Sequence, residues 1–266
     1  MTTLTRRASA TPPVGQLLRE WRERRRISQL DLSIQAEVSA RHLSFVETGR
    51  AQPTPGMILR LSEQLDVPLR ERNALLLAGG YAPAYPEHSL DEPELSRLRT
   101  ALRQILAGHE PYPALVINRW WEMLDGNAAV AVLIEGCDPA LLTPPINALR
   151  ASLHPDGMAP RIVNLPEWRA HILERLHRQA QATRDPRLAE LHAELLAYPG
   201  GVAERPEPTD VAVPLRLRHG DAELAFFSMT AVVGAPLDVT VAEVAIESFY
   251  PADAETAEAL HNWRLS

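Results

Sequence analysis

Lysine is absent from this 266-residue sequence, and cysteine occurs once, at Cys137. One cysteine excludes an intrachain disulfide and any metal site built from several cysteines, and it fits a reducing compartment such as the cytoplasm. The absence of lysine excludes S-x-x-K chemistry, and G-x-S-x-G, P-loop and G-x-G-x-x-G motifs are also missing. We therefore expect a cytoplasmic protein that is not an enzyme and has no catalytic residues and no cofactor.

Long apolar runs are also missing. None approaches the roughly 20 residues that span a bilayer, and no apolar segment of a secretory signal follows the N-terminal arginines. A metal site is suggested only by His171, Glu174 and His177, but histidines six residues apart point to different sides of a helix. We predict no membrane contact and no bound metal.

The charged residues are distributed unevenly along the chain. Residues 1–80 contain 12 Arg against 8 Asp and Glu, a formal charge of +4, whereas the remainder contains 15 Arg against 26 acids, a charge of −11. Together they give the net charge of −7, and the hydrophobic fraction of 45% is that of a globular protein. A basic first third in an acidic protein indicates that this part meets a polyanion.

Helical patterning dominates the first part of the chain. Residues 1–13 are polar and end in two prolines, which is typical of a flexible arm. Apolar spacing, prolines at helix starts and glycines at a helix end then predict helices at 14–25, 29–36, 40–48, 56–65 and 68–78. These predict an all-α domain over residues 14–80, followed by a linker at 81–93 that is rich in proline and acidic residues.

The second part of the chain mixes strands and helices. We predict a helix at 94–107, short strands at 114–118 and 120–124, and helices at 167–181 and 187–198. Three strand-like runs at 210–218, 222–230 and 239–249 precede a last helix at 254–263, with a hairpin signal at His219-Gly220-Asp221. This order predicts an α+β domain over residues 94–266, in which helices cover one face of an antiparallel sheet.

The stretch SQLDLSIQAEVSARHLSFVETGR (residues 28–50) contains two helix starts separated by a very short break. Ser28 and Ser39 are candidate N-caps, and Asp31 completes a capping-box arrangement with Ser28. The apolar positions expected inside are Leu30, Leu32, Ile34, Leu43 and Val46. The pattern fits a helix-turn-helix unit, which places its second helix in the major groove of DNA, but it also fits an ordinary αα-hairpin.

Three features of residues 14–82 resemble the phage-repressor/Cro (XRE) type of DNA-binding domain. They are the SQ-x-x-L opening at 28–32, the S-x-x-x-L-S-x-x-E-x-G-R run at 39–50, and the proline-containing loop before the fourth helix. The sequence departs from the family where Glu37 replaces the glycine of the turn, which makes a left-handed backbone conformation costlier there. The resemblance favours DNA binding over a purely structural hairpin.

The resemblance implies roles for individual residues. Arg22 and Glu47 match a structural pair that joins the first and third helices, and Gln29 is expected to bind phosphate and support the third helix. The polar leading turn and the base-facing positions are Ser39, Ala40, Arg41, Ser44 and Phe45, where arginine suits guanine and apolar groups suit the thymine methyl. Thr48, Arg50 and Gln52 are expected to contact phosphates without reading sequence.

Residues of about 95–265 resemble the MmyB-like ligand-binding domain of bacterial regulators. The matching segments are YPALVINRWWEMLDGNAA, the helical PEWRAHILERLHRQAQATRDPRLAELHAELL, and the closing run from PLRLRHGD onward. One departure is Gly126, where an aromatic often precedes the asparagine, here Asn127. The resemblance implies a PAS-like domain, with helices over the concave face of a curved sheet, that binds a small, largely apolar effector such as a fatty-acid-like molecule.

Strand alternation and the helical pattern indicate a set of candidate residues for the ligand pocket. The same side chains would also suit an ordinary core between a sheet and helices. The candidates are Leu115, Ile117, Trp121, Met123, Trp168, Leu176, Phe226, Val244 and Ile246.

Together these features predict a cytoplasmic transcriptional regulator. We expect it to bind double-stranded operator DNA as a homodimer and to respond to a small apolar effector in its C-terminal domain. The alternative is a DNA-binding regulator whose C-terminal domain is a protein-interaction or dimerisation module and needs no effector. A native mass spectrum of the purified protein would separate the two by showing a bound small molecule or none.

Overall fold

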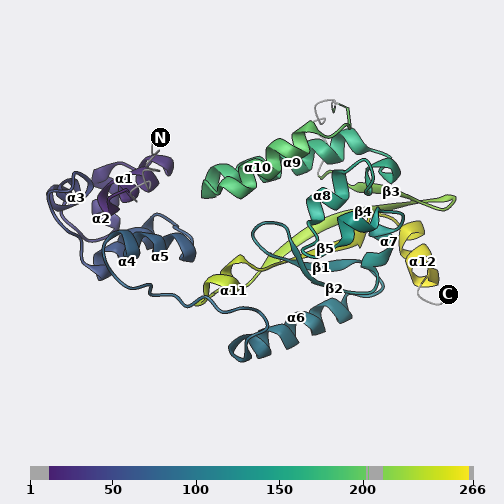
Figure 1. Cartoon of the computed structure of the whole chain (residues 1–266), viewed down its shortest axis with the longest axis horizontal. Coiled ribbons are helices and arrows are strands. Elements are labelled where there is room, and N and C mark those ends of the chain that lie inside the picture. Colours follow the sequence, from purple (N-terminus) through teal and green to yellow (C-terminus); the bar gives the residue numbers. More distant parts are fainter. Residues whose placement is uncertain (1–11, 202, 204–211, 264–266) are drawn as a thin grey trace, which may run out of the picture. The chain divides into compact units, whose positions relative to one another are not determined.

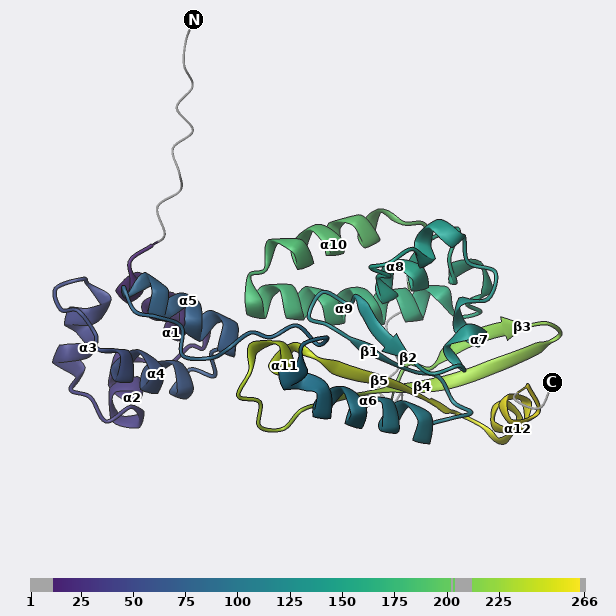
Figure 2. The ribbon, with the colours of Figure 1, turned by 60° about the horizontal axis from the view of Figure 1, so that its bottom comes forward.

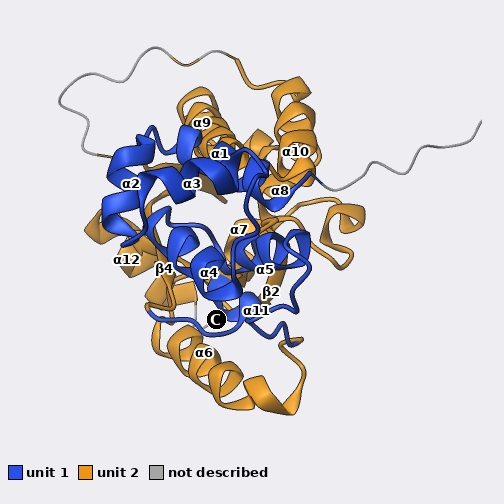
Figure 3. Cartoon of the chain, turned by 90° about the vertical axis from the view of Figure 1, so that its left-hand side faces the viewer, with its two compact units in different colours: residues 1–88, 235–242 blue, residues 89–234, 243–266 orange. Residues whose placement is uncertain are grey.

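The computed structural model describes residues 12–201, 203 and 212–263 (Figure 1). Most of the arm expected at residues 1–13 lies outside these residues. The chain divides into two compact units, which Figure 3 colours separately. The first comprises residues 1–88 and 235–242, and the second comprises residues 89–234 and 243–266. The main division therefore falls within the segment that the sequence suggests as a linker.

Residues 12–88 of the first unit contain five helices, as the sequence predicts. They are α1 (Val14–Arg24), α2 (Gln29–Gln35), α3 (Ala40–Glu47), α4 (Pro55–Gln64) and α5 (Leu69–Ala78). The side-chain oxygens of Ser28, Ser39 and Thr54 accept hydrogen bonds from backbone N–H groups at the starts of α2, α3 and α4. These caps satisfy N–H groups that have no partner within the helix, and they fix where each short helix begins.

The core of the first unit draws on all five helices. Leu18, Leu32, Leu43 and Val46 are buried in it, and Ile58, Leu61, Leu75 and Leu76 extend it into α4 and α5. Two residues expected inside lie outside, because the side chains of Leu30 and Ile34 are 60% and 68% exposed. In a helix of two turns, only the face bearing Leu32 and Ser33 points inward.

The segment before the last strand is helical, although the sequence suggested a strand from residue 239. Here α11 covers Val239–Glu243. The Asp238 carboxylate accepts hydrogen bonds from the backbone N–H groups of Thr240 and Val241, at 2.8 and 3.2 Å. Aspartate in this position stabilises a helix start, and the cap outweighs the β-propensity of the valines.

The second unit is built on a five-stranded antiparallel sheet with the strand order β2-β1-β5-β4-β3. The strands are β1 (Ala114–Ile117), β2 (Met123–Gly126), β3 (Leu215–His219), β4 (Ala222–Val232) and β5 (Ala245–Pro251). The predicted hairpin joins β3 to β4 through Gly220, whose φ of +58° is a conformation that glycine adopts without strain. The strand predicted at 120–124 begins later, because Trp120 and Trp121 form the turn before β2.

Helices cover both faces of this sheet (Figure 2). One face packs against α6 (Ser96–Gly108), through Leu102 and Leu106 against Val116 and Ile246. The other faces α7 (Val130–Ile134), α8 (Ala148–Leu153), α9 (Leu165–Thr183) and α10 (Pro186–Ala197), and α12 (Ala254–Trp263) follows β5. Short 3₁₀ turns lie at Pro93–Leu95, Pro139–Leu142 and Ala159–Arg161. None of the described helices is long and apolar enough to cross a membrane.

Both edges of the sheet make hydrogen bonds to other parts of the same unit. Beside β3, the backbone N–H of Val163 donates to the carbonyl of Arg216 at 2.8 Å, and Arg161 donates to the carbonyl of Arg218 at 3.0 Å. Beside β2, the N–H of Met123 donates to the carbonyl of Ile146 at 2.7 Å. Segments outside the five strands therefore occupy positions where another strand would pair.

Candidate DNA-binding surface and effector cavity

The turn between α2 and α3 has the tight geometry of a helix-turn-helix unit. Its Glu37 has a φ of +53°, so this glutamate adopts the left-handed conformation for which the sequence lacks a glycine. The N–H groups on either side remain paired: Ala36 donates to Leu32 and Val38 to Ser33, both at 2.9 Å. These bonds hold a conformation that is uncommon for a residue with a side chain.

Helix α3 is anchored to α1 by a buried ion pair. Nε and Nη2 of Arg22 donate to the two carboxylate oxygens of Glu47, at 2.7 and 2.8 Å, and these bonds raise the pKa of Arg22. Gln29 Nε2 donates to the same carboxylate at 2.7 Å, which supports α3 as the sequence suggested. Gly15 lets the helices approach closely, because a Cβ there would lie 2.0 Å from the carbonyl oxygen of Val46.

The outer side of α3 presents the proposed base-facing residues. Arg41 is exposed, and its guanidinium carbon lies 5.4 Å from the centre of the Phe45 ring. Arg50, beyond the end of α3, reaches the same ring at 6.0 Å. Ala40 and Ser44 are partly exposed in the same helix. Phe45 thus lies between two arginines, and the attraction of its ring for both guanidinium groups keeps the two side chains beside α3.

The remaining proposed DNA contacts make bonds within the domain. The Ser39 oxygen caps α3, and the Thr48 hydroxyl donates to the carbonyl of Ser44 at 2.7 Å. The Gln52 amide donates to the carbonyl of Gly79 at 2.9 Å, although the residue is exposed. Gln29 is likewise bound to Glu47 through its amide. Phosphate contacts by Gln29, Thr48, Arg50 and Gln52 stay predictions.

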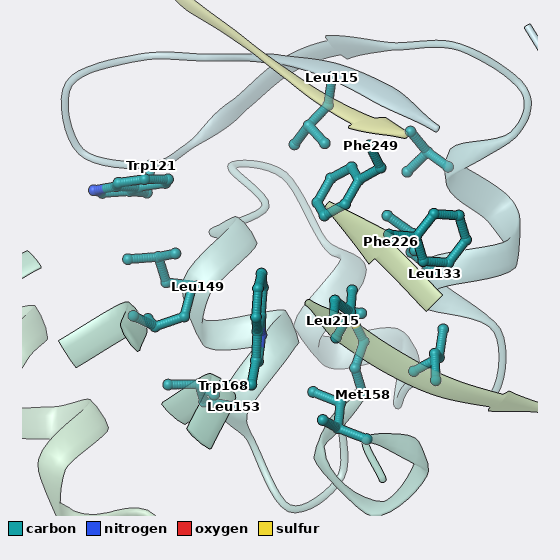
Figure 4. Packing of buried hydrophobic residues seen from close by; sticks show 14 of the residues in the cluster. Leu115, Trp121, Leu133, Leu149, Leu153, Met158, Trp168, Leu215, Phe226 and Phe249 are labelled. Carbon is teal, nitrogen blue, oxygen red and sulfur yellow. The ribbon is translucent and has the colours of Figure 1, made fainter. Parts of the chain in front are cut away.

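An apolar cavity of about 70 Å³ lies between the sheet and helices α7, α8 and α9 of the second unit. Figure 4 shows Leu115, Trp121, Trp168 and Phe249 arranged around this interior region. Five of the residues suggested from sequence line the cavity, namely Leu115, Ile117, Trp121, Met123 and Trp168. These five residues thus lie around one cavity, and ligand contact by them stays a prediction.

Four suggested residues lie elsewhere. Val244 and Ile246 pack toward α6 on the opposite face of the sheet, and Leu176 and Phe226 are fully buried in the core without lining the cavity. Alternation along β5 explains the error for Ile246, because Glu247 and Phe249 are the residues of that strand that line the cavity. Because helices cover both faces of the sheet, both faces carry apolar residues. An apolar residue in a strand therefore does not indicate which face it lies on.

Gly126 does not line the cavity, so the missing aromatic at this position does not open it directly. A Cβ at Gly126 would approach a methyl carbon of Val130 to 3.3 Å, and Val130 is part of the wall. Asn127 is structural, because its side chain accepts from the N–H of Ala114 and donates to the carbonyls of Leu106 and Tyr112.

A charged pair that sequence reasoning missed forms part of the cavity wall. Nη1 and Nη2 of Arg175 donate to the two carboxylate oxygens of Glu247, at 2.9 and 3.0 Å. The Thr230 hydroxyl donates to Glu247 at 2.8 Å and also contacts Arg175. The signal in the sequence is an acid in the run VAIESF whose neighbours on the same strand face, Ala245 and Phe249, are apolar, which is unusual for a strand covered on both faces.

Trp121 contacts Arg175 of this pair and is bound to both α8 and α9. Its φ is +66°, a conformation that is rare for a bulky side chain. The indole N–H donates to Gln179 at 2.8 Å, and the Arg175 guanidinium lies 4.4 Å from the ring centre. The Trp121 carbonyl accepts from the N–H of Ala148 at the start of α8. Contacts with both helices hold the strained residue in place.

The three polar residues considered as a metal cluster do not act as a unit. His171 stacks on Trp168, with ring centres 5.6 Å apart, whereas His177 lies beside His192 of α10 at 5.2 Å. Burial, and then the charge of Arg175, lowers the pKa of His171. Burial, and then His177, lowers the pKa of His192. Both shifts favour neutral histidines in the folded protein.

Comparisons with known proteins agree with this architecture. Residues 98–262 match the family described as the MmyB-like transcription regulator ligand binding domain, and residues 13–75 match a helix-turn-helix domain family. Fold and sequence together define a helix-turn-helix transcriptional regulator. The chain belongs to the family of transcription regulators with an MmyB-like ligand-binding domain.

One curated relative is the uncharacterized HTH-type transcriptional regulator RghRB of Bacillus subtilis (strain 168). It is 34% identical over 111 residues, which cover 41% of this chain and 78% of that protein. A solved structure of an RNA-binding Light-Oxygen-Voltage receptor is 15% identical with a TM-score of 0.27, over 98% of this chain and 65% of that one. A likeness this low carries no argument about fold or function.

Proposed function

We propose that this DNA-binding regulator changes its operator affinity when a small, mainly apolar molecule occupies the cavity of its second unit. The observation that carries the proposal is the composition of the wall. Among the described residues that line the cavity, only Ser152, Arg175 and Glu247 have polar side chains outside the two indoles. Apolar walls with a few polar groups are the usual form of a small-molecule site. A molecule with an aliphatic chain like that of a fatty acid is the first candidate effector.

The cavity wall suggests how occupancy would be transmitted. It includes residues of α7, α8 and α9 as well as of the sheet. A molecule that enters must be accommodated by displacement of these helices, because protein interiors are close-packed. An effector shifts the equilibrium between two arrangements only as far as it binds one of them better. We propose that the arrangement of α8 and α9 differs between the free and occupied states.

The DNA-binding part of the proposal rests on α3 and on a homodimer. Palindromic operators place half-sites about 34–36 Å apart, which fixes the separation of two recognition helices. Helices α1 to α5 form a small domain, so we propose that the second unit supplies the dimer contact. Arg41 beside Phe45 is the side chain proposed to read bases.

The test measures operator affinity of the full chain with and without aliphatic ligands, after the operator has been isolated by genomic pull-down. Salt is held constant, because phosphate contacts make affinity depend strongly on ionic strength. Ala148→Leu adds volume to a residue that lines the cavity, and we expect it to remove the effector response while retaining DNA binding. Ala193→Leu, exposed on α10, is the matched control.

Two results would overturn the proposal. One is an operator affinity that no aliphatic ligand changes, together with the absence of any bound molecule in native mass spectra. The other is an unchanged response in Ala148→Leu, because a ligand that tolerates the added leucine does not occupy this cavity. The first result would favour the alternative in which the second unit binds a partner protein and needs no effector, whereas the second would place the effector at another site. A monomer at the concentrations used for DNA binding would contradict the homodimer.

A further inference from the structure

The pair of Arg175 and Glu247 restricts which end group a ligand can carry into the apolar cavity. We propose that the cavity selects ligands whose polar end is uncharged, such as an alcohol, an ester or a ketone, over carboxylates of the same chain length. This inference rests on the proposed function and makes its ligand class more specific. It also identifies Glu247 as the residue that determines the selectivity.

The geometry leaves little of either charge uncompensated. The contact is bidentate, and the side chains of Arg175 and Glu247 are 24% and 7% exposed. Thr230 adds a third hydrogen bond to the carboxylate. Paired guanidinium and carboxylate groups of this kind are geometrically specific and strong. The Glu247 carboxylate thus occupies the side of the guanidinium that an incoming carboxylate would otherwise bind.

The net charge of the lining is consequently zero. Arg175 contributes +1 and Glu247 contributes −1, and the other described residues of the wall carry no formal charge. The nearby His171 favours its neutral form, since burial and Arg175 lower its pKa. A carboxylate brought into this cavity would lose its hydration, meet no free positive charge and lie close to the negative charge of Glu247.

An uncharged oxygen meets a different environment. A guanidinium has five N–H donors, and the contacts to Glu247 and Thr230 account for three. An alcohol, ester or ketone oxygen can accept from a remaining N–H without displacing Glu247, while its chain contacts the apolar wall. Ser152 is already an acceptor for the indole N–H of Trp168, at 3.0 Å. The Ser152 O–H can still donate, so Arg175 and Ser152 are the two donors that this wall offers to a neutral end group.

The experiment compares matched ligands on the full chain by isothermal titration calorimetry. Hexanol is compared with hexanoate, and decanol with decanoate, at about pH 8, where the carboxylates are ionised. We expect each alcohol to bind at least about tenfold more tightly than the carboxylate of equal length, because burying an unpaired charge is costly.

Variants test whether Glu247 is the cause. Glu247→Gln keeps the shape and removes the negative charge, so Arg175 becomes available and carboxylates should gain at least about tenfold in affinity relative to alcohols. The double variant Arg175→Gln/Glu247→Gln restores a neutral wall, and the preference for alcohols should return. Glu194→Gln is the matched control, because Arg150 and Glu194 form a bidentate pair outside the cavity wall.

Each outcome has a defined meaning. Carboxylates that bind the unaltered protein as tightly as alcohols, or more tightly, would overturn this inference and leave the proposed function standing. Failure of all four ligands to bind would overturn both. A folded Glu247→Gln protein with an unchanged preference would also overturn the assignment to Glu247. If that variant does not fold, the comparison on the unaltered protein and the neutral double variant decide.

Discussion

Replacing Glu47 by alanine should destabilise the first unit, because it leaves the buried guanidinium of Arg22 without its carboxylate. The Glu47 side chain is 1% exposed and that of Arg22 is 10% exposed. Solvent therefore cannot readily replace the lost partner. Gln29 also loses the oxygen to which its amide donates at 2.7 Å. Two donors that now hold α1 and α2 against α3 would be left without their acceptor.

The magnitude follows from the contacts that remain. Removal of one partner from a buried ion pair costs about 3–5 kcal/mol. Arg22 keeps its hydrogen bond to the carbonyl of Ile27 at 3.0 Å and lies 4.0 Å from Glu23. These contacts place the expected loss at the lower end, about 3 kcal/mol. Adding Arg22→Ala removes the stranded charge and should recover about 1 kcal/mol of the loss.

Hydrogen exchange of the full chain, followed by mass spectrometry of peptides from α1 and α3, measures this loss locally. The matched control is Glu87→Ala, which breaks the more exposed pair with Arg70 and should change exchange little. Additive effects of the Arg22 and Glu47 substitutions would refute the reasoning, because they would mean that the two charges do not depend on each other.

Three further predictions concern binding, packing and pH. Arg41→Ala should weaken operator binding by about 1–3 kcal/mol and relax one base preference per half-site; an unchanged base preference in a binding-site selection would assign Arg41 to phosphate. Phe226→Ala should lower the free energy of unfolding by about 3–5 kcal/mol, because Phe226 is fully buried. A variant of unchanged stability that lacks only the effector response would contradict this. Burial, and then the charge of Arg175, lowers the pKa of His171 in the folded protein. As the pH falls, the imidazole therefore takes up a proton in the unfolded chain before it does so in the folded protein. Stability should fall as pH drops below about 6.5, until the lowered pKa is passed. His171→Gln should reduce that dependence in thermal melts, and an identical pH profile would contradict it.

The helices of the first unit were predictable because their signals are local. Ser28, Ser39 and Thr54 cap the helices that they precede, and the positive φ of Glu37 follows from the length of the turn. Which face of each short helix is buried was less predictable, since Leu30 is apolar yet exposed. Helical spacing over two turns does not fix which apolar side chains face inward.

The cavity was only partly predictable because it depends on contacts between distant segments. Ile246 and Glu247 are adjacent in β5, and apolarity alone favours Ile246 for the interior, whereas Glu247 lines the cavity. The partner that makes burial of Glu247 tolerable is Arg175, 72 residues earlier in the chain. No local pattern indicates such a pairing, and the left-handed Trp121 depends in the same way on Gln179.

The bonds at the two edges of the sheet bear on how copies of this protein associate. An open edge strand is a template for strand addition from another chain, which can lead to swapped dimers or fibres. Here the segment around Val163 binds beside β3, and Ile146 binds beside β2. Backbone pairing between copies would first have to displace these segments. If the second unit supplies the dimer contact, as proposed, these bonds favour contacts between side-chain surfaces, which substitutions can change without altering the sheet.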